Sequence, residues 1–347
     1  MIYILLVILI IGLGYAIKDK KKYCIISGTL MFLLMLFRDP KLGNSDTVSL
    51  YIPSFYRINV FSISQLLQYY HNTDVFFYII TKVITLFTTN LNIYFGICAL
   101  PFCFFATRLI YKYSKMPVLS FIMLISLNYY AWSYIIIRHT VALAFIILSY
   151  DYIKNNKIIK FVCCVLIASL FHKSAIIFLI AYPIANKIKL SSKKMNLILI
   201  ALIPIVVFAG KYIINFGISF IKSGDYTLYK TRQDTMGIGM FLIYYIPFIV
   251  SCFLDKNMEK ERVNYNIVFV GLVFSMLTIH LAEFFRIGMY FLIFNILMLP
   301  NIFSELSDTK NKKIMYWIMV ICFIMYMLKS FNVLGLIPYY SNVIKFY

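Results

Sequence analysis

The sequence predicts an all-α, polytopic membrane protein rather than a set of soluble domains. Hydrophobic residues make up 62% of the 347 residues and charged residues only 13%, whereas soluble domains average about 45–50% and about 25%. The apolar residues recur in long blocks separated by short charged loops. In a bilayer, helices satisfy their backbone hydrogen bonds within each segment, so such blocks are expected to be helical. We therefore expect one transmembrane domain over residues 1–347.

About twelve blocks can cross about 30 Å of hydrocarbon, the shorter ones with lysines at their ends that reach the interface. The first block lacks a basic leading region and a small-residue cleavage site, and lysines follow it. It is therefore expected to remain as a span rather than be removed as a signal peptide. The predicted spans cover residues 2–17, 23–37, 91–110, 117–136, 139–153, 159–173, 174–186, 195–213, 239–254, 263–280, 287–303 and 314–331.

The segment Val75–Thr88 decides the topology. It is short, it contains Lys82, and its length is typical of re-entrant or interfacial helices. If it does not span, the loops on one side carry 20 Lys and Arg residues against 12 on the other, and if it spans the counts become 13 and 19. The positive-inside rule favours the first arrangement. It predicts external loops over 38–74 and 214–238, with both termini outside the cytoplasm.

The net charge of +20 reflects this topology and does not indicate a nucleic-acid partner, because the lysines lie in clusters between apolar blocks. The arginines are distributed differently from the lysines. Arginine suits phosphate and carboxylate because its planar fork donates two hydrogen bonds at once. An outer face with arginines at the ends of spans indicates binding of anionic head groups. Five of the seven arginines are on the predicted outer side, namely Arg38, Arg57, Arg138, Arg232 and Arg286.

Motifs for nucleotides, metals and disulfides are missing from the sequence. The seven cysteines lie in or beside apolar blocks and have no spacing typical of a disulfide framework or a zinc site. There is no Walker loop, no GxGxxG, no HExxH and no DxD pair. We also find no internal repeat of the transporter kind. The sequence therefore predicts no metal and no cofactor.

Two polar constellations lie early in the predicted outer side. The turn-rich loop after the second span holds Arg38 and Asp46, which are candidates for phosphate binding and a general base; the alternative is a solvated loop whose arginine anchors a helix end. Arg138 and His139 interrupt apolar residues almost without a loop, so Arg138 is expected near membrane depth. Ionisable residues at such places are usually functional; the alternative for Arg138 is a structural ion pair.

Three further groups lie later in the chain. His172 and Lys173 stand between two apolar runs, where the histidine can exchange a proton near neutral pH and the lysine can pair with an anion, unless the histidine only stabilises a helix hairpin. Glu283 and Arg286 are three residues apart and are followed by Tyr290; the pair can also simply neutralise itself. Tyr339 can face a sugar ring or belong to the interfacial aromatic belt.

In this order and at this spacing, these motifs resemble the EpsG family of polysaccharide polymerases, a branch of the Wzy-type O-antigen and exopolysaccharide polymerases. The chain departs from the family pattern at Thr47, where a tyrosine is usual, at His139, where glutamine is common, and at Asp74, where glutamate is frequent. The resemblance extends from about residue 30 to 342. The positions that correspond to the family motifs, with the departures at Thr47 and His139 among them, are Arg38, Gly43, Asp46, Thr47, Ile137-Arg138-His139, Phe171-His172-Lys173-Ser174, Arg286, Tyr290 and Pro338-Tyr339.

The resemblance implies a reaction and a fold similar to the metal-independent GT-C membrane glycosyltransferases. A growing glycan on undecaprenyl pyrophosphate would be transferred to a lipid-linked repeat unit at the outer face of the bacterial cytoplasmic membrane. Arg138, Arg286 and Arg38 would stabilise the pyrophosphate, and Asp46 or His172 would act as the base. The implied partners are the lipid-linked oligosaccharide, membrane lipid, a flippase and a chain-length regulator.

Two other classes of function remain open. A flippase-like transporter of lipid-linked sugars or polysaccharide would need a polar pathway to both faces, whereas the ionisable residues favour the outer half. A membrane acyltransferase would need a deeper site centred on histidine and an entrance for an acyl donor.

Overall fold

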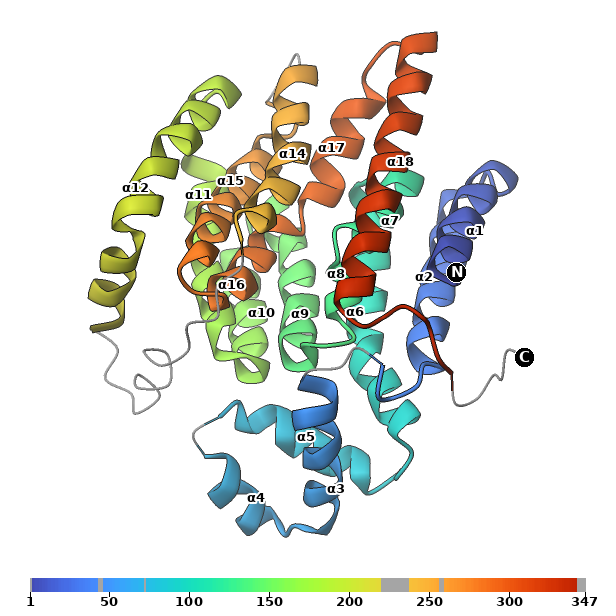
Figure 1. Ribbon diagram of the computed structural model, residues 1–347, viewed down its shortest axis with the longest axis vertical. Coiled ribbons are helices and arrows are strands. Elements are labelled where there is room, and N and C mark those ends of the chain that lie inside the picture. Colours follow the sequence, from blue (N-terminus) through green and yellow to red (C-terminus); the bar gives the residue numbers. More distant parts are fainter. Residues whose placement is uncertain (1, 43–45, 72, 220–236, 256–258, 342–347) are drawn as a thin grey trace. The chain divides into compact units, whose positions relative to one another are not determined.

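The computed structural model describes residues 2–42, 46–71, 73–219, 237–255 and 259–341, and no strand occurs among them (Figure 1). The chain divides into two compact units. The first combines Met1–Leu179 with Ser307–Tyr347, and the second is Ile180–Leu306. Each of the twelve segments predicted as spans contains helix, so the all-α prediction is confirmed for the described residues. Most of the predicted loop 214–238 lies outside the described residues.

The first unit contains helices of very different lengths. Its described elements are α1 (Ile2–Ala16), α2 (Lys20–Leu36), the π-helix η1 (Thr47–Tyr51), α3 (Ile52–Val60), α4 (Ile63–Tyr70), α5 (Val75–Thr85), α6 (Leu91–Tyr113), α7 (Pro117–Ser126), α8 (Tyr129–Trp132), α9 (Ile137–Lys154), α10 (Ile158–Phe171) and α18 (Lys310–Val333), with the 3-10 helix η2 (Lys173–Ile180) following α10. The central helix is α9, which is buried along most of its length and packs against α6 and α10.

The second unit is also helical. Within it, Asn266 of α15 donates its side-chain amide to the carbonyls of Ile184 and Ile188, which closes the end of α11. Gly271 of α15 and Gly288 of α16 let these two helices approach closely, since an added Cβ at Gly271 would overlap the α16 side. The described elements are α11 (Ala181–Lys187), α12 (Ser192–Ser219), α14 (Gly239–Leu254), α15 (Arg262–Met276), η3 (Leu277–Ile279), α16 (Glu283–Leu292) and α17 (Asn295–Ser304).

Several helices are long and apolar enough to cross a membrane. Among the described residues these are Leu91–Tyr113, Ser192–Phe216, Arg262–Ile279, Glu283–Ser304 and Lys310–Val333. Five shorter apolar helices accompany them. The chain is thus built as a multi-pass membrane protein, while the count of about twelve spans remains a prediction.

One predicted span is interrupted. The sequence predicts a continuous helix over 117–136, but α7 ends at Ser126 and α8 begins at Tyr129. Asn128 adopts a left-handed conformation with φ 67°, and its side chain contacts α18, donating to the hydroxyl of Tyr326 at 2.9 Å and accepting from Ser330 at 2.7 Å. An asparagine tolerates this conformation better than most residues, and contacts from a distant helix hold it there.

The first unit has different side-chain contacts at its two ends. At one end, Tyr3 packs against Tyr134, Phe331 and Tyr339; we call this the Arg38 end, since Arg38 also contacts Tyr134. At the other end, Asp151 pairs with Arg108 at 2.5 Å.

Helices α3, α4 and α5 form a small cap at the Arg38 end (Figure 1). The amine of Lys82 in α5 donates to the carbonyl of Asn59 near the end of α3 at 3.0 Å, and the rings of Tyr70 and Tyr78 stack at 3.8 Å. With 11 residues, α5 is about 16 Å long, too short for about 30 Å of hydrocarbon. This length fits the predicted non-spanning segment.

Candidate functional site

The centre of the candidate site is the carboxylate of Asp74, which lies directly before α5. Its Oδ2 is 3.1 Å from Nη1 of Arg138 and 3.0 Å from Nδ1 of His172. Its Oδ1 accepts a hydrogen bond from the backbone N–H of Lys173 at 3.0 Å. One carboxylate therefore joins the start of α5, the start of α9 and the turn after α10.

The environment keeps Asp74 ionised. Its side chain is 8% exposed, and this burial alone would raise the pKa of the carboxyl group. The hydrogen bond and charge of His172, the charge of Arg138 and the N–H of Lys173 outweigh that effect and lower the pKa below its ordinary value. Asp74 is therefore a fixed negative charge between the guanidinium of Arg138 and the imidazole of His172, rather than a group that exchanges protons at neutral pH.

Arg138 lies in the first turn of α9 with 17% of its side chain exposed. Its backbone N–H donates to the hydroxyl of Tyr51 at 3.2 Å, and its guanidinium lies 5.6 Å from the centre of the Tyr78 ring. Its Nε has no hydrogen-bond partner among the described residues. A cation at a helix N-terminus is unfavourable by itself, because the helix dipole is positive there. The carboxylate of Asp74 offsets this unfavourable placement of the cation.

His172 lies between the end of α10 and η2, and 16% of its side chain is exposed. Asp74 contacts its Nδ1, and in the described part of the chain no hydrogen-bond partner is found for its Nε2. A carboxylate at Nδ1 holds a proton on that nitrogen and leaves Nε2 as the basic one. The ring of His139 lies 5.6 Å from the ring of His172, edge to face, and His139 is buried.

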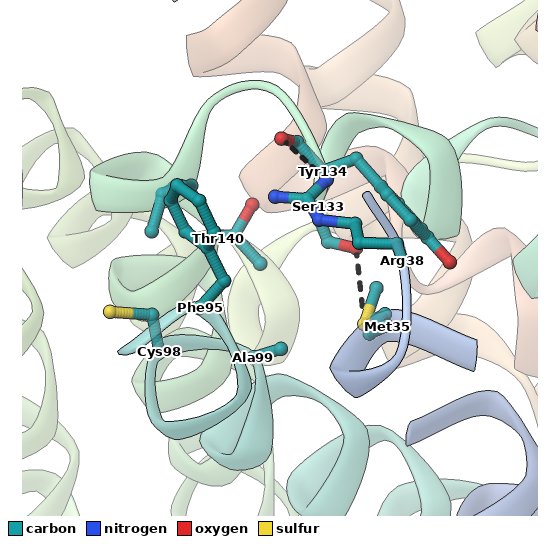
Figure 2. Close-up of a pocket in the computed structure, with 9 residues that line it drawn as sticks. Met35, Arg38, Phe95, Cys98, Ala99, Ser133, Tyr134 and Thr140 are labelled. Atoms are coloured by element: carbon teal, nitrogen blue, oxygen red, sulfur yellow. Dashed lines mark hydrogen bonds between the residues drawn. The ribbon is translucent and has the colours of Figure 1, made fainter. Parts of the chain in front are cut away.

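Arg38 lies beside this group, but its guanidinium is directed into the protein. It is 3% exposed, its Nη1 donates to the backbone carbonyl of Tyr134 at 2.9 Å, and it lies over the rings of Tyr134 and Phe95 at 4.5 and 4.9 Å. Figure 2 shows these residues around a cavity of about 10 Å³. Such a volume admits about one water molecule.

The other predicted residues of the first unit differ in position. Asp46 is half-buried at the start of η1 and close enough to Tyr51 to raise the pKa of that phenol together with the larger effect of burial. The side chain of Lys173 is exposed. Tyr339 donates its hydroxyl to the carbonyl of Leu34 at 2.9 Å, and its ring packs edge-on against Tyr3, so these contacts anchor the chain end to α2.

The remaining predicted residues belong to the second unit. Glu283 and Arg286 lie in the first two turns of α16 and are half-buried, and Tyr290 is buried one turn later. All three are on one short helix whose preceding turn holds His280, and that ring contacts the carbonyl of Val206 at 2.7 Å.

Two residues of the site were not selected from the sequence. Asp74 looks like an ordinary helix-start residue, and Tyr51 is one of 29 tyrosines. A usable signal for Asp74 is that it is the acidic residue directly before the short apolar helix that decides the topology. Nothing in the sequence distinguishes Tyr51. Among the described residues, no group of three or more His, Cys, Asp or Glu residues is placed to hold a metal ion.

Comparison with known protein families gives a match to the EpsG family over residues 21–341, nearly the whole chain. The chain belongs to the EpsG family. This is a family of Wzy-type, polymerase-like proteins, so the resemblance seen in the sequence is confirmed. Comparisons with curated proteins and with solved structures gave no match. The EpsG match includes every residue of the Asp74 group.

In chemical terms, the group combines an anion-binding cation with a histidine whose tautomer is fixed. The guanidinium of Arg138 has donors beyond the one used by Asp74. The imidazole of His172 offers Nε2 as a proton acceptor. Both side chains are partly exposed, Arg138 by 17% and His172 by 16%.

Proposed function

We propose that this EpsG-family protein is a polysaccharide polymerase of the Wzy type in the bacterial cytoplasmic membrane. It transfers a growing glycan from undecaprenyl pyrophosphate to a lipid-linked repeat unit at the outer face. The observation that carries the proposal is the carboxylate of Asp74, which contacts both the guanidinium of Arg138 and the imidazole of His172. Anion binding and proton acceptance are the two functions that this transfer requires.

The transfer is a displacement at the anomeric carbon of the donor glycan. A hydroxyl group of the acceptor sugar forms the new C–O bond while the bond between the anomeric carbon and the pyrophosphate oxygen breaks. The proton of the hydroxyl passes to a base, and the bonding electrons leave with undecaprenyl pyrophosphate. Negative charge therefore develops on the leaving group and positive charge must meet it there.

Arg138 supplies that charge in our proposal. Loss of one preorganised donor to developing charge typically costs about 10²–10³ in rate. The start of α9 adds backbone N–H dipoles of the same sign. Arg286 of the second unit is a second candidate for the pyrophosphate, with Glu283 and Tyr290 near it on α16. Lys173 is a further candidate cation, since its side chain is exposed beside the turn that Asp74 holds.

His172 is the proposed base, with Asp46 as the alternative. The contact between Asp74 and Nδ1 supports His172, because it fixes the ring and presents the basic Nε2 outward. His139 packs against the ring and limits its rotation. Asp46 is half-buried at the start of η1, and a carboxylate is also a group that can accept the proton. Variants of both residues separate the two.

The membrane arrangement follows from the charge count. The Arg38 end would face outward, with α5 as an interfacial or re-entrant helix and Tyr339 near the same surface. The lipid-linked substrates would approach from the outer leaflet, after a flippase has delivered the repeat unit, and a chain-length regulator would act with the polymerase. The proposed chemistry uses no metal and no cofactor, because arginine provides the positive charge.

The test is a deletion strain examined for surface polysaccharide on gels. Loss of a polymerase leaves a single repeat unit at the surface, whereas loss of a flippase leaves none, and loss of an acyltransferase leaves full-length chains without an acyl group. Complementation with wild type should restore long chains, and Arg138→Lys should not. Long chains in the deletion strain would contradict the proposal.

A further inference from the structure

We infer that Arg38 is a positioning residue: it holds the turn that carries Arg138 and does not itself bind the pyrophosphate. The inference rests on the proposed function and assigns a different role to one arginine of the outer side. It starts from the 3% exposure of Arg38, which leaves almost none of the side chain for a ligand. The adjoining cavity of about 10 Å³ admits about one water molecule and not a phosphate group.

The guanidinium of Arg38 contacts a backbone carbonyl and aromatic rings inside the protein. It donates to the carbonyl of Tyr134 and lies over two aromatic rings, which stabilise a cation without a carboxylate partner. No acidic side chain of the described residues forms an ion pair with it within 4.0 Å. Burial of a charge is costly. We therefore take the hydrogen bond to the carbonyl of Tyr134 as the structural role of this buried guanidinium.

That carbonyl is held twice. Thr47 of η1 donates its hydroxyl to the same oxygen of Tyr134 at 2.7 Å. One helical turn further along, the hydroxyl of Tyr51, also from η1, accepts the backbone N–H of Arg138. Hydrogen bonds with Arg38, Thr47 and Tyr51 therefore fix the backbone of residues 134–138 at both of its ends. From this hydrogen-bonded segment, the guanidinium of Arg138 reaches Asp74.

The backbone around Arg38 is itself fixed by hydrogen bonds with other parts of the first unit. The side chain of Asn92 donates to the carbonyls of Leu36 and Arg38 at 3.0 and 2.5 Å. Ser341 donates to the carbonyl of Phe37 at 2.5 Å, and the N–H of Asp39 donates to the carbonyl of Tyr340 at 2.8 Å. The backbone on both sides of Arg38 is thus fixed relative to α6 and to residues 340–341, which is expected for a residue that positions another.

The test separates turnover from ligand binding. Purified Arg38→Gln and Thr47→Val variants in proteoliposomes should both lose turnover with lipid-linked repeat units, since a misplacement of about 1 Å can cost about 10²-fold. Thermal stabilisation by added undecaprenyl pyrophosphate should persist in both variants and should be lost in Arg138→Gln. Arg38→Lys should recover part of the turnover, because lysine also donates to the carbonyl. Arg262→Gln is the matched control and should behave as wild type, because Arg262 lies in a predicted cytoplasmic loop and pairs with Glu259.

The outcomes are distinct. Loss of undecaprenyl pyrophosphate binding in Arg38→Gln, with full activity in Thr47→Val, would show that Arg38 is a direct ligand and overturn the inference. If Arg38→Gln does not fold, Thr47→Val still decides, since it removes only one hydroxyl donor from the same carbonyl. If undecaprenyl pyrophosphate does not stabilise the wild-type protein at all, the proposed function fails instead.

Discussion

The substitution Asp74→Asn tests the site most directly. It keeps the size of the side chain, removes its charge and leaves one oxygen where the carboxylate has two. That oxygen can still accept from Lys173, but the amide cannot serve both Arg138 and His172 as Oδ2 does at 3.1 and 3.0 Å. The variant therefore leaves the guanidinium without its counter-charge and the imidazole without its fixed tautomer.

The expected magnitudes follow from these two losses. Removing one partner of a buried ion pair costs about 3–5 kcal/mol, and because Arg138 keeps 17% of its side chain exposed, we expect about 2–3 kcal/mol of unfolding free energy here. An asparagine that selects the wrong imidazole tautomer lowers turnover by about 10⁴ in a serine protease. We expect a loss of about 10²–10⁴ for Asp74→Asn.

The assay is polymerisation in proteoliposomes with lipid-linked repeat units, with product lengths read on a gel and protein amounts matched. Asp39→Asn is the matched control, because Asp39 is an acidic residue of the same outer region whose side chain accepts a local backbone N–H from Lys41. Polymerisation by Asp74→Asn within about threefold of wild type would refute the reasoning, since it would show that neither Arg138 nor His172 needs the carboxylate.

The pH dependence of stability provides a second measurement on Asp74→Asn. The folded environment lowers the pKa of Asp74, so its stabilising contribution is fully present above the ordinary carboxyl value of about 3.9 and is lost as pH falls through the lowered folded value. The gap in Tm between wild type and Asp74→Asn should therefore persist from pH 7 to about pH 5 and shrink below about pH 4. A gap that disappears between pH 7 and 5 would contradict this assignment.

Three further predictions address the other parts of the proposal. Arg138→Lys keeps the charge but not the planar fork, so turnover in the proteoliposome assay should fall by about 10²–10³; wild-type activity would mean that the arginine only anchors a helix. His172→Gln should abolish chain extension while Asp46→Asn retains a measurable fraction, with expression matched by immunoblot; the reverse result would make Asp46 the base. Reporter fusions after Lys194 and after Lys222, the latter outside the described residues, should give cytoplasmic and external signals, and the opposite pair would show that the segment 75–88 spans.

The sequence was sufficient for the helical class because apolar blocks and lysine clusters are local features. Each of the twelve predicted segments contains helix, and Arg138 and His172 could be selected because each breaks an apolar run. The contact between Asp74 and His172 joins residues 98 positions apart, and no spacing rule brings such positions together. The break at Asn128 was missed for the same reason, since the polar groups that hold its left-handed backbone come from α18.

Arg38 and Arg138 also show that a sequence does not reveal whether a side chain points into the protein or toward its surface. Arg38 and Arg138 look alike in the sequence, each at the end of an apolar block on the predicted outer side. In the structure Arg38 is directed inward to a carbonyl and two rings, whereas Arg138 meets a carboxylate and keeps part of its surface exposed. Burial distinguishes them, and burial depends on packing among α2, α6 and the turn before α9.

The ion pair between Arg138 and Asp74 is compatible with both of the roles considered for Arg138 from the sequence. An arginine near membrane depth is costly without a counter-charge, so a carboxylate at 3.1 Å keeps the guanidinium in place when no substrate is bound. The guanidinium has five N–H donors, and the described contacts leave its Nε without a partner. Because the Nε itself is buried, we propose that a phosphate oxygen binds the donors in the exposed part of the guanidinium. In our proposal, the pyrophosphate shares this guanidinium with Asp74, so the ion pair that holds Arg138 in place also directs it toward the leaving group.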